Sequence, residues 1–135
     1  MKLSHFASII VLGSCGLVAC GSSRDVEVKG DVSASDGVAG DEAIRLEFYE
    51  PRAAGEGEPE ELELVHSISL SQLGSFTEEV PLEGDRVHVI ALIDRDGDEA
   101  CTDGEPWGEA EVTITEEDTA EVSLSIAQSA ACPAL

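Results

Sequence analysis

Six carboxylates lie within the twelve residues from Asp94 to Glu105, where Arg95 is the only basic residue. Carboxylates this close repel one another unless a cation lies between them, and oxygen ligands suit a hard divalent ion. Asp94, Asp96, Asp98 and Glu105 stand at positions 1, 3, 5 and 12 of the segment, the spacing at which calcium-binding loops supply side-chain oxygens. The spacing therefore predicts a site for Ca²⁺, the one cofactor that we expect.

Two features separate this segment from a loop of the EF-hand type. That loop has glycine at position 6 for a sharp turn, whereas here position 6 is Glu99 and the glycine is Gly97. The preceding residues are also typical of a strand and not of a helix. We therefore expect a calcium loop at the end of a β-strand. The alternative is a solvated acidic loop in which Asp96-Gly97 and Asp103-Gly104 are turn dipeptides.

A second candidate for chemistry is Cys20, which ends an apolar run that begins at Phe6, after the lone charge of Lys2. Small residues before a cleavage point are typical of an exported precursor, and the run is shorter than the roughly 20 residues that span a bilayer. The residues Leu17-Val18-Ala19-Cys20 resemble the lipobox of bacterial lipoproteins. The resemblance implies a signal peptide over residues 1–19 and fatty acylation of Cys20, with palmitate as one expected acyl chain. Several such chains hold a protein on a membrane.

Two alternatives to this anchor stay open. Cys20 is an ordinary cysteine after a simple secretory signal, or Cys15 is the modified residue, although residues 12–14 make a poorer lipobox. We favour lipidation of Cys20 because of its distance from the start of the chain and its place at the end of the run. Gly21 and Ser22 follow it, which resembles an outer-membrane sorting signal of enteric bacteria. We expect a location in the cell envelope, in the outer membrane rather than the inner if the host is Gram-negative.

The composition of the remaining 116 residues, from 20 to 135, suits one acidic domain. We expect a lipidated cysteine and tether over residues 20–24 and a single domain over residues 25–135. All 29 acidic residues lie in this part, and loss of Lys2 takes the net charge from −22 to −23. This charge repels nucleic acid and anionic lipid headgroups, which argues against a nucleic-acid partner. The charge also favours cations and basic partners, but the explanation that we prefer for the acidity is a solvated surface, such as one adapted to a saline setting.

Cys101 and Cys132 are the only other cysteines besides Cys15 and Cys20. A pair of cysteines in an exported domain favours a disulfide, which would connect the acidic segment to the C-terminal tail. The alternative is two free thiols.

Apolar residues of the mature part recur mostly at every second position, which is typical of half-buried strands. The run from Val87 to Ile93 is almost continuously apolar, as in a central strand that is covered on both faces. We place loops over residues 31–41 and 52–61 and expect Pro51 to end a strand. The fold class that follows is all-β, an antiparallel β-sandwich of about seven strands with Greek-key connections. The expected strands contain residues 26–28, 44–48, 62–70, 76–80, 87–93, 110–114 and 120–126.

Three segments resemble the transthyretin-like or carboxypeptidase-regulatory-like modules of exported proteins. These are Gly74-Ser75-Phe76, then residues 84–91 (Gly-Asp-Arg-Val-His-Val-Ile-Ala), then the closing residues 111–125. Val87 stands where that family usually has a tyrosine. The resemblance covers most of the mature chain, and it implies a binding or structural module and not a reaction.

Motifs for catalysis are absent from the sequence. It has neither a Gly-x-Ser-x-Gly elbow nor a His-Glu-x-x-His motif, and we interpret His66 and His88 as residues on strand surfaces or rims. Phe48 and Phe76 are expected in the core, and Trp107 is expected to cap one end of the sandwich. The sequence thus predicts a membrane-anchored, non-enzymatic envelope lipoprotein with a structural or binding role, whose partner would be an envelope protein or a polysaccharide. The alternative is an accessory module that binds polysaccharide or peptide for a neighbouring enzyme or transporter.

Overall fold

The computed structural model describes residues 21–35, 37–38, 41–128 and 131–135. These residues form seven strands and no helix, so the expected all-β class is confirmed. No helix of the described part is long and apolar enough to cross a membrane. The strands are β1 (Arg24–Ala34), β2 (Ile44–Ala53), β3 (Glu60–Leu70), β4 (Gly74–Leu82), β5 (Arg86–Leu92), β6 (Pro106–Thr113) and β7 (Thr119–Gln128).

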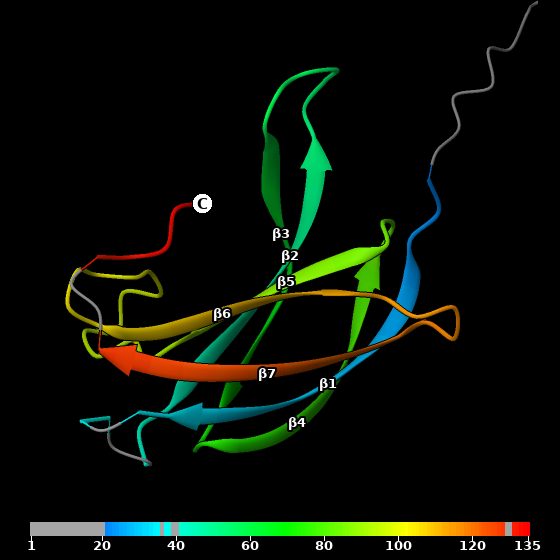
Figure 1. Ribbon diagram of the computed structural model, residues 1–135. Coiled ribbons are helices and arrows are strands. Elements are labelled where there is room, and N and C mark those ends of the chain that lie inside the picture. Colours follow the sequence, from blue (N-terminus) through cyan, green and yellow to red (C-terminus); the bar gives the residue numbers. More distant parts are fainter. Residues whose placement is uncertain (1–20, 36, 39–40, 129–130) are drawn as a thin grey trace, which may run out of the picture.

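The strands form one curled sheet in the order β3-β2-β5-β6-β7-β1-β4 (Figure 1). The strands β3, β2, β5 and β6 make one layer, and β7, β1 and β4 make the other, as in a sandwich. The layers are continuous where β6 pairs with β7, at Pro106↔Gln128 and Trp107↔Ala127. All pairings of the described strands are antiparallel except that of β1 with β7, which is parallel.

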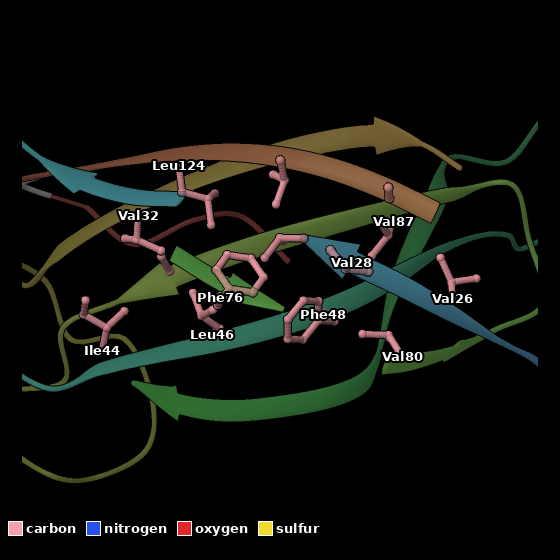
Figure 2. Packing of buried hydrophobic residues seen from close by; sticks show 14 of the residues in the cluster. Val26, Val28, Val32, Ile44, Leu46, Phe48, Phe76, Val80, Val87 and Leu124 are labelled. Carbon is pink, nitrogen blue, oxygen red and sulfur yellow. The ribbon is translucent and has the colours of Figure 1, made fainter. Parts of the chain in front are cut away.

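The core lies between the two layers and is made of alternating residues from both layers. Phe48 of β2 and Phe76 of β4 face each other edge-on across it, with ring centroids 6.2 Å apart (Figure 2). Both are buried, as the sequence predicts. Burial of one such ring contributes on the order of 2–3 kcal/mol, so the apolar alternation is what holds the two layers together.

Two expected strand limits are wrong. The segment from Asp31 was expected to be a loop, but β1 continues to Ala34 because it pairs on one side with β4 and on the other with β7. Pro51 was expected to end a strand, but β2 continues to Ala53. The pairing of β2 with β5 ends at Tyr49, so beyond this point β2 has β3 as its one partner strand and is an edge, where a sheet tolerates proline.

Strand β6 approaches β7 closely, and Gly108 makes this possible. A Cβ atom at this position would lie 2.2 Å from the carbonyl oxygen of Ser125, which is far inside contact distance. The strands therefore meet at a position where no side chain fits, and the two layers remain one sheet there.

The central strand β5 is covered on both faces, as its apolar run predicts. Val87, Val89 and Ala91 face the core between the layers, and Ile90 and Leu92 are also buried, each 2% exposed. The second face is covered by residues of the segment that follows β5 and by the C-terminal tail. These two segments lie side by side at one end of the molecule (Figure 1).

Candidate metal site

The acidic segment is the connection between β5 and β6, at the end of a strand as expected. Three of the four predicted ligands, Asp94, Asp96 and Asp98, come together, with one carboxylate oxygen of each within 4.8 Å of the others. Asp94 is half-buried and the other two are exposed. The arrangement supplies three oxygen ligands to one point, which is the chemistry that a hard divalent cation prefers.

The turn of this loop forms without the glycine that an EF-hand has at position 6. Glu99 stands there with φ of 64°, and Gly97 has φ of 77°. Glycine adopts this left-handed backbone without strain, whereas a glutamate there is strained by about 1 kcal/mol. Two positive φ angles in three residues bend the chain back toward the strand, so the three aspartates share one side of the loop.

Backbone N–H groups orient the aspartates. Asp94 accepts from the N–H of Gly97 through Oδ1 at 2.6 Å and from that of Glu99 through Oδ2 at 2.8 Å. Asp96 accepts from the N–H of Asp98 at 3.2 Å and from the hydroxyl of Thr102 at 3.0 Å. These two hydrogen bonds, the one from Asp98 foremost, lower the pKa of Asp96 below its ordinary value. The carboxylate is therefore held in its charged form.

The fourth predicted ligand, Glu105, lies apart from the group of three. It is buried, with 6% of its surface exposed, and its carboxylate accepts hydrogen bonds from three backbone N–H groups. These belong to Arg95 at 2.6 Å, Asp96 at 3.4 Å and Thr102 at 2.9 Å. Glu105 thus ties the two ends of the loop together, a role that the spacing alone does not reveal.

A disulfide joins Cys101 to Cys132, with Cα atoms 5.8 Å apart. The tail next to this cysteine is also fixed by Trp107 of β6, whose indole N–H donates to the carbonyl of Ala131 at 2.8 Å. Trp107 was expected to cap one end of the sandwich, and it lies in β6 as the cross-strand partner of Leu92. The acidic loop and the tail are thereby held together over the outer face of the sheet.

Both histidines of the described part contact glutamates on another strand. His66 of β3 lies 2.9 Å from Glu78 of β4, so the pair connects the two edge strands of the sheet. His88 of β5 lies 2.9 Å from Glu109 of β6. Each is a cross-strand contact at a rim or on a strand surface, in keeping with the sequence interpretation.

Sequence reasoning missed Glu50, which is 2% exposed. Its carboxylate accepts from the backbone N–H of Glu83 at 2.7 Å and of Gly84, and it pairs with Arg52 at 2.9 Å. The carboxylate thus fixes the turn between β4 and β5. The alternation of β2 hides it, because a glutamate in a strand normally points to solvent.

Cys20, the predicted lipidation site, and Cys15 lie outside the described residues. The described chain begins at Gly21, and β1 begins at Arg24. Arg24 pairs with Asp118 at 2.6 Å and donates to the carbonyl of Glu83 at 3.1 Å. The chain therefore leaves the domain at the end that carries the β4–β5 and β6–β7 turns.

Comparisons with known proteins identify no family. No protein-family model matches the chain, and no curated protein matches it. Among solved structures, a candidate cell adhesion protein from Bacteroides eggerthii has 16% identity over 78% of this chain, with a TM-score of 0.45. The shaft pilin SpaA from Lactobacillus rhamnosus GG has 8% identity over 80% of this chain, with a TM-score of 0.36. The chain spans 40% and 52% of their lengths, and at these scores the likeness carries no argument about function.

Proposed function

We propose that the mature chain is a lipid-anchored, non-enzymatic protein of the cell envelope, and that its β-domain has a structural or binding role there. The observation that carries the proposal is the run Leu17-Val18-Ala19-Cys20 at the end of the N-terminal apolar segment. The Cys101–Cys132 disulfide supports export, because disulfides persist in oxidising compartments and are rare in the cytosol.

The start of β1 indicates how far from the proposed anchor the domain would lie. Three residues, Gly21 to Ser23, separate Cys20 from the first strand. An extended tether of this length reaches about 10 Å, so the domain would lie close to the bilayer surface. Strand β5 runs from the β4–β5 turn, near the tether, to the acidic loop. The acidic loop would therefore face away from the membrane (Figure 1).

A non-enzymatic role is supported by how the polar side chains are used. Glu50 and Glu105, the two buried carboxylates of the described part, accept backbone hydrogen bonds that fix turns. His66 and His88 contact glutamates across strands. These groups hold the fold together, and general acid–base catalysis would need them in a site open to substrate.

We further propose that Ca²⁺ binds at the group of Asp94, Asp96 and Asp98, with water or backbone carbonyls as its other ligands. Three carboxylates supply the charge, and Ca²⁺ accepts six to eight oxygens in flexible geometry. Extracellular modules bind it with dissociation constants of about 10⁻⁴–10⁻³ M. Ca²⁺ would then stabilise a loop in which Glu99 is strained, and no turnover would depend on it.

The anchor is tested by Cys20→Ser. We expect the variant to lose membrane retention, because it lacks the thiol that carries the acyl chains. Inhibition of the lipoprotein signal peptidase should accumulate the precursor of the unchanged protein, because this enzyme cleaves the signal peptide just before the lipidated cysteine. Cys15→Ser is the matched control and should fractionate with membranes as the unchanged protein does. Membrane fractionation followed by mass spectrometry of the N-terminal peptide checks both. Retention of Cys20→Ser on membranes would falsify the proposal.

A further inference from the structure

A cavity of about 190 Å³ lies between the outer face of the sheet and the segments that the disulfide ties over it. Its floor is Tyr49 of β2 with Ile90 and Leu92 of β5, and these three residues are buried, at 6%, 2% and 2% exposed. Its roof comes from two segments far apart in sequence, the acidic loop and the C-terminal tail. The roof residues are Ala100, Cys101, Pro133 and Leu135.

The roof is held in place at several points. Cys101, itself a lining residue, is bonded to Cys132 of the tail. The indole of Trp107 holds the carbonyl of Ala131. The loop side of the roof is tied down by Glu105, which accepts from the N–H of Thr102 at 2.9 Å. The loop side of the roof, and the tail at Ala131 and Cys132, are therefore constrained, whereas Leu135 at the outer side of the roof is 70% exposed.

The floor and roof are mainly apolar, and this sets the first property of a ligand. An apolar cavity of about 150 Å³ stays dry and takes up a molecule the size of benzene, because removal of apolar surface from water is favourable on both sides. A cavity of about 190 Å³ thus suits one aromatic ring or a short alkyl chain.

The charged residues at the opening of the cavity determine the second property of a ligand, because their charges do not cancel. Glu47 is satisfied at both oxygens, by Arg45 Nε at 2.6 Å and by the hydroxyl of Tyr49 at 2.6 Å. Burial and this hydrogen bond raise the pKa of Tyr49, so the phenol remains a donor. Glu99 lines the cavity with 80% of its side chain exposed, and Arg45 approaches it only to 3.9 Å. One guanidinium thus stands against two carboxylates, which leaves a negative charge at the opening.

We infer that this cavity is a binding site for a small molecule that combines a compact apolar group with a protonated amine. The apolar group lies on Tyr49, Ile90 and Leu92, and the ammonium lies at the rim beside Glu99. The inference stands apart from the lipid anchor and from the calcium site, since none of the three clustered aspartates lines the cavity.

Three probes of the same size test it, namely benzylamine, benzyl alcohol and benzoate. The full-length protein in detergent is titrated with each and followed by saturation-transfer NMR. We expect saturable binding of benzylamine with a dissociation constant on the order of 1 mM, a common affinity for so few atoms. Benzyl alcohol should bind several-fold more weakly, because it leaves Glu99 without a cation, and benzoate should be the weakest of the three.

Variants separate the cavity from the surface and from the micelle. Ala100→Phe from the roof and Ile90→Phe from the floor each place a ring in the cavity, so each should abolish saturable binding. Ala134→Phe adds the same ring to the tail outside this cavity and should leave binding unchanged. Glu99→Gln should weaken benzylamine about threefold and leave benzyl alcohol unaffected, whereas Asp103→Asn in the same loop should change neither.

A melting curve of each variant shows whether it folds. The roof variant and the floor variant are independent, so if one of them does not fold, the other still tests the site. Equal binding of benzylamine to the unchanged protein and to a folded variant with a filled cavity would overturn the site. Equal affinity for benzylamine and benzyl alcohol would overturn the amine specificity.

Discussion

At the scale of single residues, the acidic loop divides its carboxylates between two tasks. Asp94, Asp96 and Asp98 converge on one point, whereas Glu105 is buried and holds the loop's own backbone. The difference lies in burial. A buried carboxylate must be satisfied by donors, and the three N–H groups around Glu105 do this. The half-buried Asp94 and the exposed Asp96 and Asp98 keep lone pairs that a cation can use.

The calcium proposal is tested with Asp96→Asn combined with Asp98→Asn. Each change removes a charged ligand, so the calcium-specific rise in melting temperature should disappear. For the unchanged protein we expect about 2.7 kcal/mol of stabilisation when calcium is a hundredfold above its dissociation constant. Calorimetric titration and melting curves measure the two effects.

Magnesium at matched ionic strength is the control for this experiment, because any salt screens the charge of the protein. Asp103→Asn is the matched variant, an acidic residue of the same loop outside the group of three. A titration without saturable heat, together with a melting shift no larger than that of magnesium, would leave the segment as an acidic turn.

At the scale of elements, the outer face of β5 depends on a cover that is not a strand. Ile90 and Leu92 would be exposed without the acidic loop and the tail, and neither segment has a regular structure to hold it there. The Cys101–Cys132 disulfide supplies this constraint, together with the contact of Trp107 with the tail. The same two segments line the candidate cavity, so loss of the cover would also remove the cavity.

Cys101→Ala combined with Cys132→Ala should lower the free energy of unfolding by about 3–4 kcal/mol, because the disulfide closes a long loop in the unfolded chain. The tail should also leave Trp107, which shifts the fluorescence of the single tryptophan in the chain. Denaturant unfolding and emission spectra measure these effects. In the unchanged protein, non-reducing peptide mapping should recover Cys101 and Cys132 as one linked species. Unaltered stability in the double variant would contradict this account.

At the scale of the whole molecule, charge is the dominant feature. The net charge is −22, and the basic residues of the described part pair with acidic ones, such as Arg24 with Asp118 and Arg86 with Glu60. Exposed pairs contribute about 0–1 kcal/mol each, so they offset little of the repulsion among the carboxylates. Self-repulsion at this charge destabilises the compact state.

Screening should therefore stabilise the protein. Between 10 mM and 1 M sodium chloride the Debye length falls from about 30 Å to about 3 Å, and repulsion between exposed carboxylates falls with it. We expect the melting temperature to rise by about 5 °C, which corresponds to roughly 1 kcal/mol for a domain of this size. Calorimetry in calcium-free buffer measures the shift. A melting temperature that falls with salt would mean that ion pairs outweigh the repulsion.

The sequence by itself determined which segments are strands and which faces they bury, but not where β1 and β2 end. Alternating apolar residues in β2 and β7 indicate strands that are buried on one face, and the continuous apolar run of β5 indicates a strand that is buried on both faces. These patterns lie within single strands, so they can be read from the sequence. It also predicted the position of the acidic loop and the partner of Cys101. The anchor at Cys20 stays a prediction.

Only the tertiary structure decided which strands are neighbours. The parallel pairing of β1 with β7 joins the two ends of the domain, and the continuation of β2 through Pro51 depends on where its partner β5 stops. The separation of Glu105 from the three aspartates, and the cavity beneath the tail, are decided in the same way. Each depends on contacts between residues far apart in the chain, and a local pattern of residue types carries no record of such contacts.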